Sequence, residues 1–126
     1  MQHLRHYEAA PSKARTATFT SESLVNRGCG AVIGIDVTAV TDTPNVSQLE
    51  LQALVGGSWK TFAKWDTLTI NAAGQYQFLA CPGATASAEW TAPPIPTVVP
   101  LNFRVKLTHD DADSITYSVT VTEVQG

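Results

Sequence analysis

The chain has 126 residues, which is enough for one domain with a single hydrophobic core. Its formal net charge is -3 and no basic patch is visible, which argues against a nucleic-acid partner. No run of about 18 apolar residues occurs and the first residues lack the apolar core of a secretion signal, so we expect a cytoplasmic product with no membrane partner. Only 15% of the residues are charged, so a partner could cover this surface without desolvating many charges.

The first fourteen residues are mixed and polar, contain Pro11 and show no periodicity. We therefore expect an extended N-terminal arm over residues 1–14 that is either flexible or ordered only against a neighbour, followed by a β-sandwich domain over 15–126. Leu4 and Tyr7 of this arm are candidate partner-binding residues. His3, His6 and Glu8 superficially suggest a metal cluster, but a flexible arm does not pre-organise ligands, and chance occurrence is favoured.

The first part of the domain predicts strands. A short strand is expected near Arg15, where small and apolar residues alternate with threonines up to Thr20. The run Gly30–Val40 is apolar on both sides, which is typical of a central strand covered on both faces, and Gly34 within it marks a close approach or a bulge. The alternating run 48–55 is the next strand, and a tight glycine turn at 56–58 predicts a hairpin into 59–65.

Two more strands are expected at Leu68–Ile70 and Gln75–Ala80. The following stretch, residues 82–100, holds five prolines and small residues, which predicts a long loop stiffened into an extended ridge. Loops of this length are usually functional or contact a partner. Its candidate partner-binding residues are Trp90, Pro93, Pro94, Ile95 and Pro96.

The last two runs, Val99–Thr108 and Ile115–Thr122, alternate strictly between apolar and polar residues. We interpret them as an antiparallel pair joined by the acidic turn His109–Asp113, with one buried and one solvated face. Seven or eight short strands without an amphipathic helix predict an all-β protein: a single antiparallel β-sandwich of jelly-roll or immunoglobulin-like type.

Candidate chemistry is sparse. The acidic turn could gather carboxylates around calcium, but its spacing does not match a calcium loop, and a solvated turn is favoured. His109 is the only histidine in the predicted domain, and no two carboxylates are paired by sequence, so we expect no enzyme, no cofactor and no metal. Cys29 and Cys81 lack a CxxC spacing; reduced thiols are favoured over a disulfide bridge.

Trp59 and Trp65 fall on one face of their strand, and packing in the core is favoured for both. They also keep open a carbohydrate-binding or host-surface-binding alternative, which exposure of either ring on a concave sheet face would support. Trp90 precedes the prolines, where it either anchors the loop or contacts a partner.

Residues 15–124 resemble a recurring class of small β-sandwich virion proteins of tailed bacteriophages. The resemblance is carried by the segments Arg15-Thr16-Ala17-Thr18, Ile35-Asp36-Val37-Thr38-Ala39-Val40, Leu49-Glu50-Leu51-Gln52, Gly57-Ser58-Trp59-Lys60-Thr61, Leu68-Thr69-Ile70-Asn71-Ala72-Ala73-Gly74-Gln75-Tyr76, Phe103-Arg104-Val105 and Ile115-Thr116-Tyr117-Ser118-Val119. Residues 82–100 depart from the class in being longer and richer in proline.

The resemblance implies a structural protein of the virion, made in the host cytoplasm and added to the capsid exterior as a decoration or accessory protein. Its implied partner is the major capsid protein, together with copies of itself, a trimer being favoured because trimers suit threefold positions of a shell. A tail or head-tail joining role is the alternative within the same class. The resemblance implies binding and no catalysis.

Overall fold

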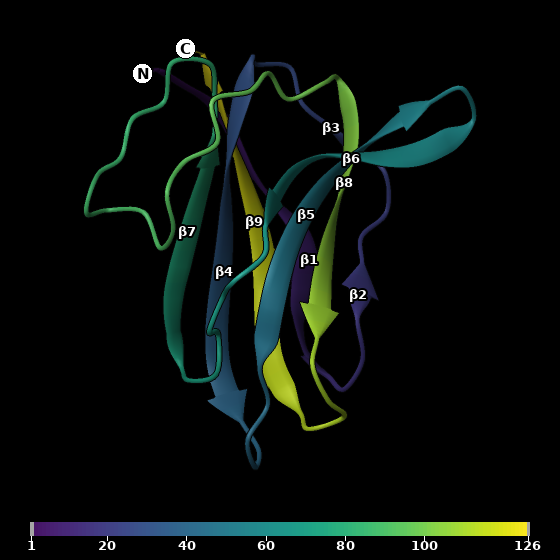
Figure 1. Ribbon diagram of the computed structural model, residues 1–126, viewed down its shortest axis with the longest axis vertical. Helices are drawn as coiled ribbons and strands as arrows, with labels where there is room; N and C mark the ends of the chain where they lie inside the picture. The colour runs from purple at the N-terminus through teal and green to yellow at the C-terminus, as the bar shows by residue number, and fades with distance from the viewer. Residues whose placement is uncertain (1, 126) are drawn as a thin grey trace.

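The computed structural model describes residues 2–125, which form nine β-strands in two antiparallel sheets packed face to face (Figure 1). The predicted all-β sandwich is therefore confirmed. The strands are β1 (Gln2–Arg15), β2 (Phe19–Thr20), β3 (Leu24–Val25), β4 (Gly30–Val40), β5 (Val46–Val55), β6 (Ser58–Trp65), β7 (Gly74–Ala80), β8 (Asn102–His109) and β9 (Ile115–Gln125).

The strand order identifies the type of sandwich. Sheet A has the order β1-β9-β4-β7, and sheet B has the order β2-β8-β5-β6 with β3 also paired to β8. Early strands pair with late ones throughout: β1 with β9, β2 and β3 with β8, β4 with β7, and β5 with β6. This is the arrangement of a long antiparallel ribbon rolled into two sheets, the jelly roll, rather than an immunoglobulin-like sandwich, in which the last two strands pair.

The predicted pairing of the last two strands is wrong. β8 lies in sheet B beside β5, whereas β9 lies in sheet A between β1 and β4, so the acidic turn crosses from one sheet to the other. The alternation did identify the inward faces, since Phe103 and Val105 of β8 and Tyr117 and Val119 of β9 are all buried. Leu101, an apolar position of the same alternating run, precedes β8 and is exposed.

The expectation of a separate N-terminal arm is also wrong. Residues 2–15 form β1, an edge strand that runs antiparallel to β9 with Tyr7 opposite Val121. Its Ala10 is buried in the core. Three register shifts interrupt the pairing, one of them between Ala10 and Lys13 around Pro11, and these irregularities erase the periodicity that a regular strand shows in sequence. Met1 lies outside the described residues.

Residues 82–100, here called the proline segment, pair with the free edge of β7 through Thr91 and Ile95, while the first part of the segment projects from this edge (Figure 1). The Ile95 amide donates to the Leu79 carbonyl at 3.0 Å, and the Cys81 amide donates to the Ile95 carbonyl at 3.1 Å. The segment thereby covers backbone groups that an edge strand would otherwise present to other chains.

The other expected elements are mostly confirmed. β4 has the predicted bounds and lies between β9 and β7, although only its inward face is fully buried. The β5–β6 hairpin turns at Gly56 and Gly57, whose φ angles of 59° and 83° favour glycine. Leu68–Ile70 forms only an isolated bridge, from Ile70 to Val46, instead of a strand.

Candidate functional site

The structure separates the predicted partner-binding residues into two groups. Leu4 and Tyr7 lie on β1, while Trp90 and residues 93–96 lie beside β7. β1 and β7 are the opposite edges of sheet A, with β9 and β4 between them. The seven residues therefore do not form one continuous surface.

Tyr7 has a structural role at its edge of the sandwich. Its side chain is half-buried, and its hydroxyl donates a hydrogen bond of 3.0 Å to the carbonyl of Val25, the last residue of β3. The Arg5 guanidinium lies over the ring, 4.5 Å from its centre. Burial raises the pKa of the Tyr7 hydroxyl, which stays protonated and able to donate. Tyr7 thus ties sheet A to sheet B, whereas Leu4 is exposed to solvent.

Most of the exposed large apolar side chains lie toward one end of the sandwich. Strand pairing explains their position. Ala53 lies opposite Phe103, so the last two residues of β5 lie beside the start of β8 and the residues just before it. β3 also pairs with the start of β8. We call this surface the apolar end; it comprises Leu4, Val25, Leu54, Val55, Val98 and Leu101.

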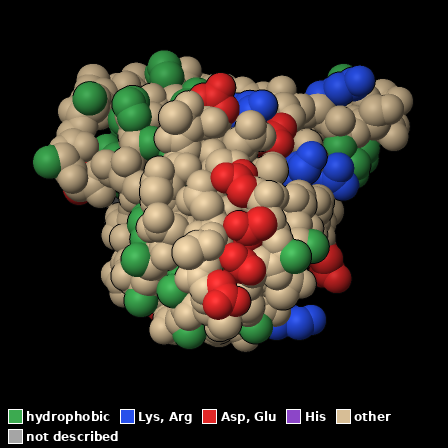
Figure 2. Space-filling model, turned by 60° about the horizontal axis from the view of Figure 1, so that its bottom comes forward, with side chains coloured by type: hydrophobic (Ala, Val, Ile, Leu, Met, Phe, Trp, Pro, Cys, Tyr) green, Lys and Arg blue, Asp and Glu red, His purple; other side chains and the backbone are tan. Residues whose placement is uncertain are grey.

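The opposite end of the sandwich is acidic. Figure 2 shows acidic side chains running in a line over this end. The Asp110 carboxylate accepts hydrogen bonds from the side chains of Ser47 and Asn45, which lower its pKa and hold it ionised. We call this surface the acidic end; it comprises Asp42 in the β4–β5 turn and Asp110, Asp111 and Asp113 in the β8–β9 turn.

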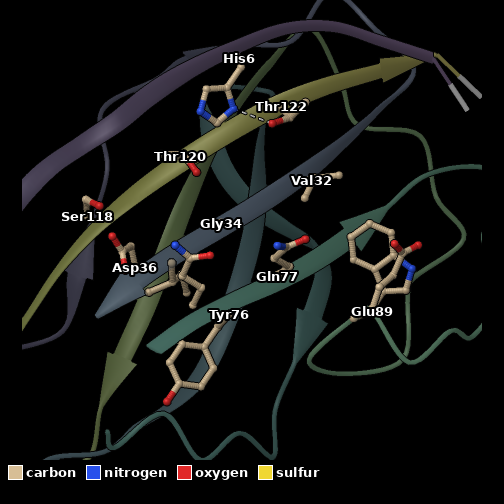
Figure 3. A pocket seen from close by; sticks show the side chains of 13 residues that line it. His6, Val32, Gly34, Asp36, Tyr76, Gln77, Glu89, Ser118, Thr120 and Thr122 are labelled. Atoms are coloured by element: carbon tan, nitrogen blue, oxygen red, sulfur yellow. Dashed lines mark hydrogen bonds between the residues drawn. The ribbon is translucent and has the colours of Figure 1, made fainter. Parts of the chain in front are cut away.

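A groove of about 460 Å³ lies on the outer face of sheet A (Figure 3). Its floor is formed where β4 passes between β9 and β7, with Gly34 opposite Thr120 on one side and Gln77 on the other. A Cβ atom on Gly34 would lie 2.6 Å from the Thr120 hydroxyl oxygen, which confirms the predicted close approach at this glycine. We call this feature the sheet A groove.

Trp90 forms the wall of the sheet A groove on the β7 side. One side of the indole packs on a small apolar cluster on the outer face of the sheet, centred on Leu79, Cys81 and Val124. The Thr91 amide donates to the Gln77 carbonyl at 2.9 Å, and the Gln77 amide donates to the Thr91 hydroxyl at 2.8 Å. Trp90 therefore both anchors the proline segment and faces the groove.

Sequence reasoning missed the sheet A groove, because its residues come from four strands and one loop that pair only in the folded protein. The single local signal was Gly34 inside a strand.

The other two tryptophans differ from each other. Trp65 is buried in the core, with its ring centre 5.4 Å from that of Phe78, as predicted. Trp59 is only half-buried and stacks under the Arg104 guanidinium, so the prediction that it belongs to the core is wrong. The reason is a bulge: the β5–β6 register shifts after Leu51, which reverses the alternation of side chains along β6.

Cys29 and Cys81 are both thiols and form no disulfide, in agreement with the favoured prediction. Burial, and then the neighbouring Cys29, raises the pKa of the Cys81 thiol.

Among the side chains that the structure describes, which exclude that of His3, no group of three or more His, Cys, Asp and Glu residues is placed to hold a metal ion. His109 shares a hydrogen bond of 2.8 Å with the hydroxyl of the buried Tyr117. Over the same part of the chain, no helix has the length and apolar character needed to cross a membrane.

Comparison with known proteins gives no relative from which a role could be transferred. No family model, no curated protein and no solved structure matches the chain.

Proposed function

We propose that this chain is a structural virion protein of a tailed bacteriophage, a decoration or accessory protein that binds the exterior of the capsid shell and stabilises it. The sequence resemblance suggests the class. The observation that carries the proposal is the polarity of the molecule: most exposed large apolar side chains lie toward one end of the jelly roll, and four aspartates lie at the other.

The apolar end supplies the binding energy in this proposal. Full burial of one Val or Leu side chain contributes about 1.5–3 kcal/mol, so a few of these side chains give a useful single contact. A symmetric shell repeats the contact, and copies of the chain that associate, for example as trimers at threefold positions, bind through several contacts at once. The partner is then the major capsid protein at the joints between its subunits.

The acidic end faces away from the shell in this arrangement. Its four aspartates stay in water, so docking does not require their desolvation. Many copies displayed on a particle would give it a negative outer surface, which keeps particles apart in solution.

The proposal is tested by sedimenting purified protein with empty capsids. The double variant Val55→Glu, Leu101→Glu places charges at two positions that are each 59% exposed, so the fold should survive while the apolar end loses its ability to dock. The matched control is Val40→Glu, an exposed valine outside the apolar end, in the last residue of β4.

We expect the wild-type and the Val40→Glu proteins to co-sediment with capsids and the double variant to remain in the supernatant. Absence of wild-type co-sedimentation with every capsid form would overturn the proposal. Co-sedimentation with purified tails and not with capsids would overturn the placement on the shell.

A further inference from the structure

We infer that the sheet A groove binds a neutral saccharide, with Trp90 as the aromatic platform and Asp36 as the main hydrogen-bond acceptor. The inference does not rest on the proposed virion role, because the groove lies on the outer face of sheet A whereas the proposed capsid contact lies at the apolar end. A copy docked through its apolar end would still present this groove to solvent.

The shape of the groove suits a small polar ligand. Its volume of about 460 Å³ falls within the range of roughly 300–1,000 Å³ that is typical of small-molecule sites. The floor is low because Gly34 has no side chain, and the Thr120 hydroxyl leans beside it, so a ligand resting on β4 would meet this hydroxyl on one side and Gln77 on the other. Figure 3 shows the side chains of β9 and β4 standing in neighbouring rows along this floor.

The polar groups of the groove are available to a ligand. Among residues 2–125, no hydrogen bond engages the side chains of Asp36, Gln75, Gln77, Ser118 or Thr120. Register explains their proximity, since Asp36 lies opposite Gln75 on β7 and opposite Ser118 on β9. Together they present a carboxylate, two amides and two hydroxyls, which can both accept and donate hydrogen bonds, as a ring of hydroxyl groups requires.

The wall of the groove supplies the apolar contact. Trp90 is fixed on one side by the cluster around Leu79 and Val124, and the hydrogen bonds between Thr91 and Gln77 fix the backbone beside it. A rigid indole offers a large flat surface at a low cost in conformational entropy. The apolar face of a pyranose ring is its natural complement, while the hydroxyls at the ring edge face the polar floor.

The charge of the groove selects against acidic ligands. Its lining includes two carboxylates, from Asp36 and Glu89, and neither Lys nor Arg. His6 on the opposite rim already shares a hydrogen bond of 2.7 Å with the Thr122 hydroxyl. Phosphates, nucleic acids and acidic sugars would meet unfavourable charge here. An extended peptide is also disfavoured, because the neighbouring β7 edge is covered by the proline segment and cannot accept an added strand.

The test is a titration of isotope-labelled protein followed by amide chemical shifts. The probes are cellobiose, maltose, chitobiose and lactose over the millimolar range, with glucuronic acid as the acidic counterpart. We expect at least one neutral sugar to give saturable shifts at Gly34, Gln77 and Thr120 and at the Trp90 indole, and glucuronic acid to bind at least several-fold more weakly.

Two variants should weaken binding, each with a matched control. Asp36→Asn removes the carboxylate and should raise the dissociation constant about tenfold, with Asp66→Asn as the exposed control outside the groove. Trp90→Leu keeps an apolar side chain on the cluster but removes the flat platform, and a similar loss is expected. Trp59→Leu, on the outer face of sheet B, should have no effect.

Binding of no probe sugar, or shifts confined to residues outside the groove, would overturn the inference. Equal affinity of wild-type, Asp36→Asn and Trp90→Leu proteins would also overturn it. The groove variants should still co-sediment with capsids as the wild type does, so failure of the saccharide site and failure of the virion proposal give different results.

Discussion

The indole nitrogen of Trp65 donates a hydrogen bond of 2.9 Å to the carbonyl oxygen of Pro93. Trp65 is the last residue of β6 and is 5% exposed, while Pro93 belongs to the proline segment that lies along β7. This contact joins β6, an edge strand of sheet B, to the segment that pairs with β7, an edge strand of sheet A. It fixes the proline segment from inside the sandwich, in addition to the backbone hydrogen bonds along β7.

Trp65→Phe should destabilise the protein by about 1–3 kcal/mol, because it removes the hydrogen bond to Pro93 and part of a buried ring. The free energy of unfolding from urea denaturation measures this loss. Trp59→Phe is the control, and its half-exposed ring should cost less than about 0.5 kcal/mol. Equal costs for the two variants would show that Trp65 does not hold the segment.

Arg5→Ala should also destabilise the fold. The Glu123 carboxylate is 1% exposed and accepts hydrogen bonds from the Arg5 guanidinium at 2.8 Å and the Arg27 amide at 2.9 Å. Loss of Arg5 leaves a buried carboxylate with one partner fewer; because the Arg5 side chain is 41% exposed, we expect about 1–3 kcal/mol rather than the larger cost of a fully buried pair.

The control for Arg5→Ala is Lys106→Ala, which removes a cation 4.0 Å from the Glu50 carboxylate without leaving a fully buried charge. Its effect on the free energy of unfolding should stay below about 1 kcal/mol. A larger effect of Lys106→Ala than of Arg5→Ala would contradict the assignment.

Stability should fall as the pH drops below about 6.5, the ordinary pKa of histidine. Burial and the neighbouring Arg15 lower the pKa of His109, whereas the unfolded chain titrates near the ordinary value of about 6.5. The unfolded state therefore binds the proton first as the pH falls, and the free energy of unfolding decreases with it. The negative charges of Asp111 and Asp110 raise the pKa of His109 and so oppose this shift, but they are smaller causes than burial and Arg15. The pKa of Asp110 itself is lowered, so Asp110 titrates at more acidic pH than the range in which His109 acts.

Urea denaturation between pH 7.5 and pH 5 measures this dependence on pH. His109→Gln keeps a side chain that can hydrogen-bond to the Tyr117 hydroxyl but cannot titrate, so its stability should vary less over this range. An unchanged slope in the variant would assign the effect to another group.

Cys81 should react slowly with iodoacetamide in the folded protein. Its thiol is buried and burial raises its pKa, so little of the reactive thiolate is present at neutral pH. Mass spectrometry after labelling gives the rate at each cysteine. Both should react at similar rates in denaturant, and rapid labelling of native Cys81 would show that this end of β7 opens readily.

Deletion of residues 1–14 should prevent stable folding. It removes the strand that pairs with the outer edge of β9 and, with it, the Arg5 partner of Glu123. Circular dichroism and solubility of the truncated chain give the result. A folded truncated protein would show that the sandwich does not need β1 in order to fold.

The sequence alone was sufficient to predict those strands and turns whose signal lies within one continuous stretch of residues. The bounds of β4 follow from its continuous apolar run, and the β5–β6 hairpin follows from local alternation and from the glycine turn. The inward faces of β8 and β9 were equally readable, because Phe103 and Tyr117 belong to strictly alternating runs.

Sheet membership could not be predicted in the same way. In a sandwich both sheets bury one face, so alternation is the same for a strand of either sheet, and pairing depends on contacts far apart in sequence. The strand β1 was not predicted because its bulges interrupt the alternation of apolar and polar residues. Trp59 was assigned to the core because a single bulge, at the register shift after Leu51, changes which side chains of β6 point inward. The sheet A groove needs four strands in register before its residues meet.

The place of β9 in sheet A bears on how the protein is made. β9 is the last of the nine strands along the chain, yet it lies between β1 and β4, so β1 has no partner in sheet A until β9 has been synthesised, whereas β4 can already pair with β7. Completion of sheet A then connects residues far apart in the chain, which is slow compared with helical folding. Until β9 inserts, the inward apolar face of β4 lacks its neighbour on one side, and that interval is when the chain is most exposed to aggregation.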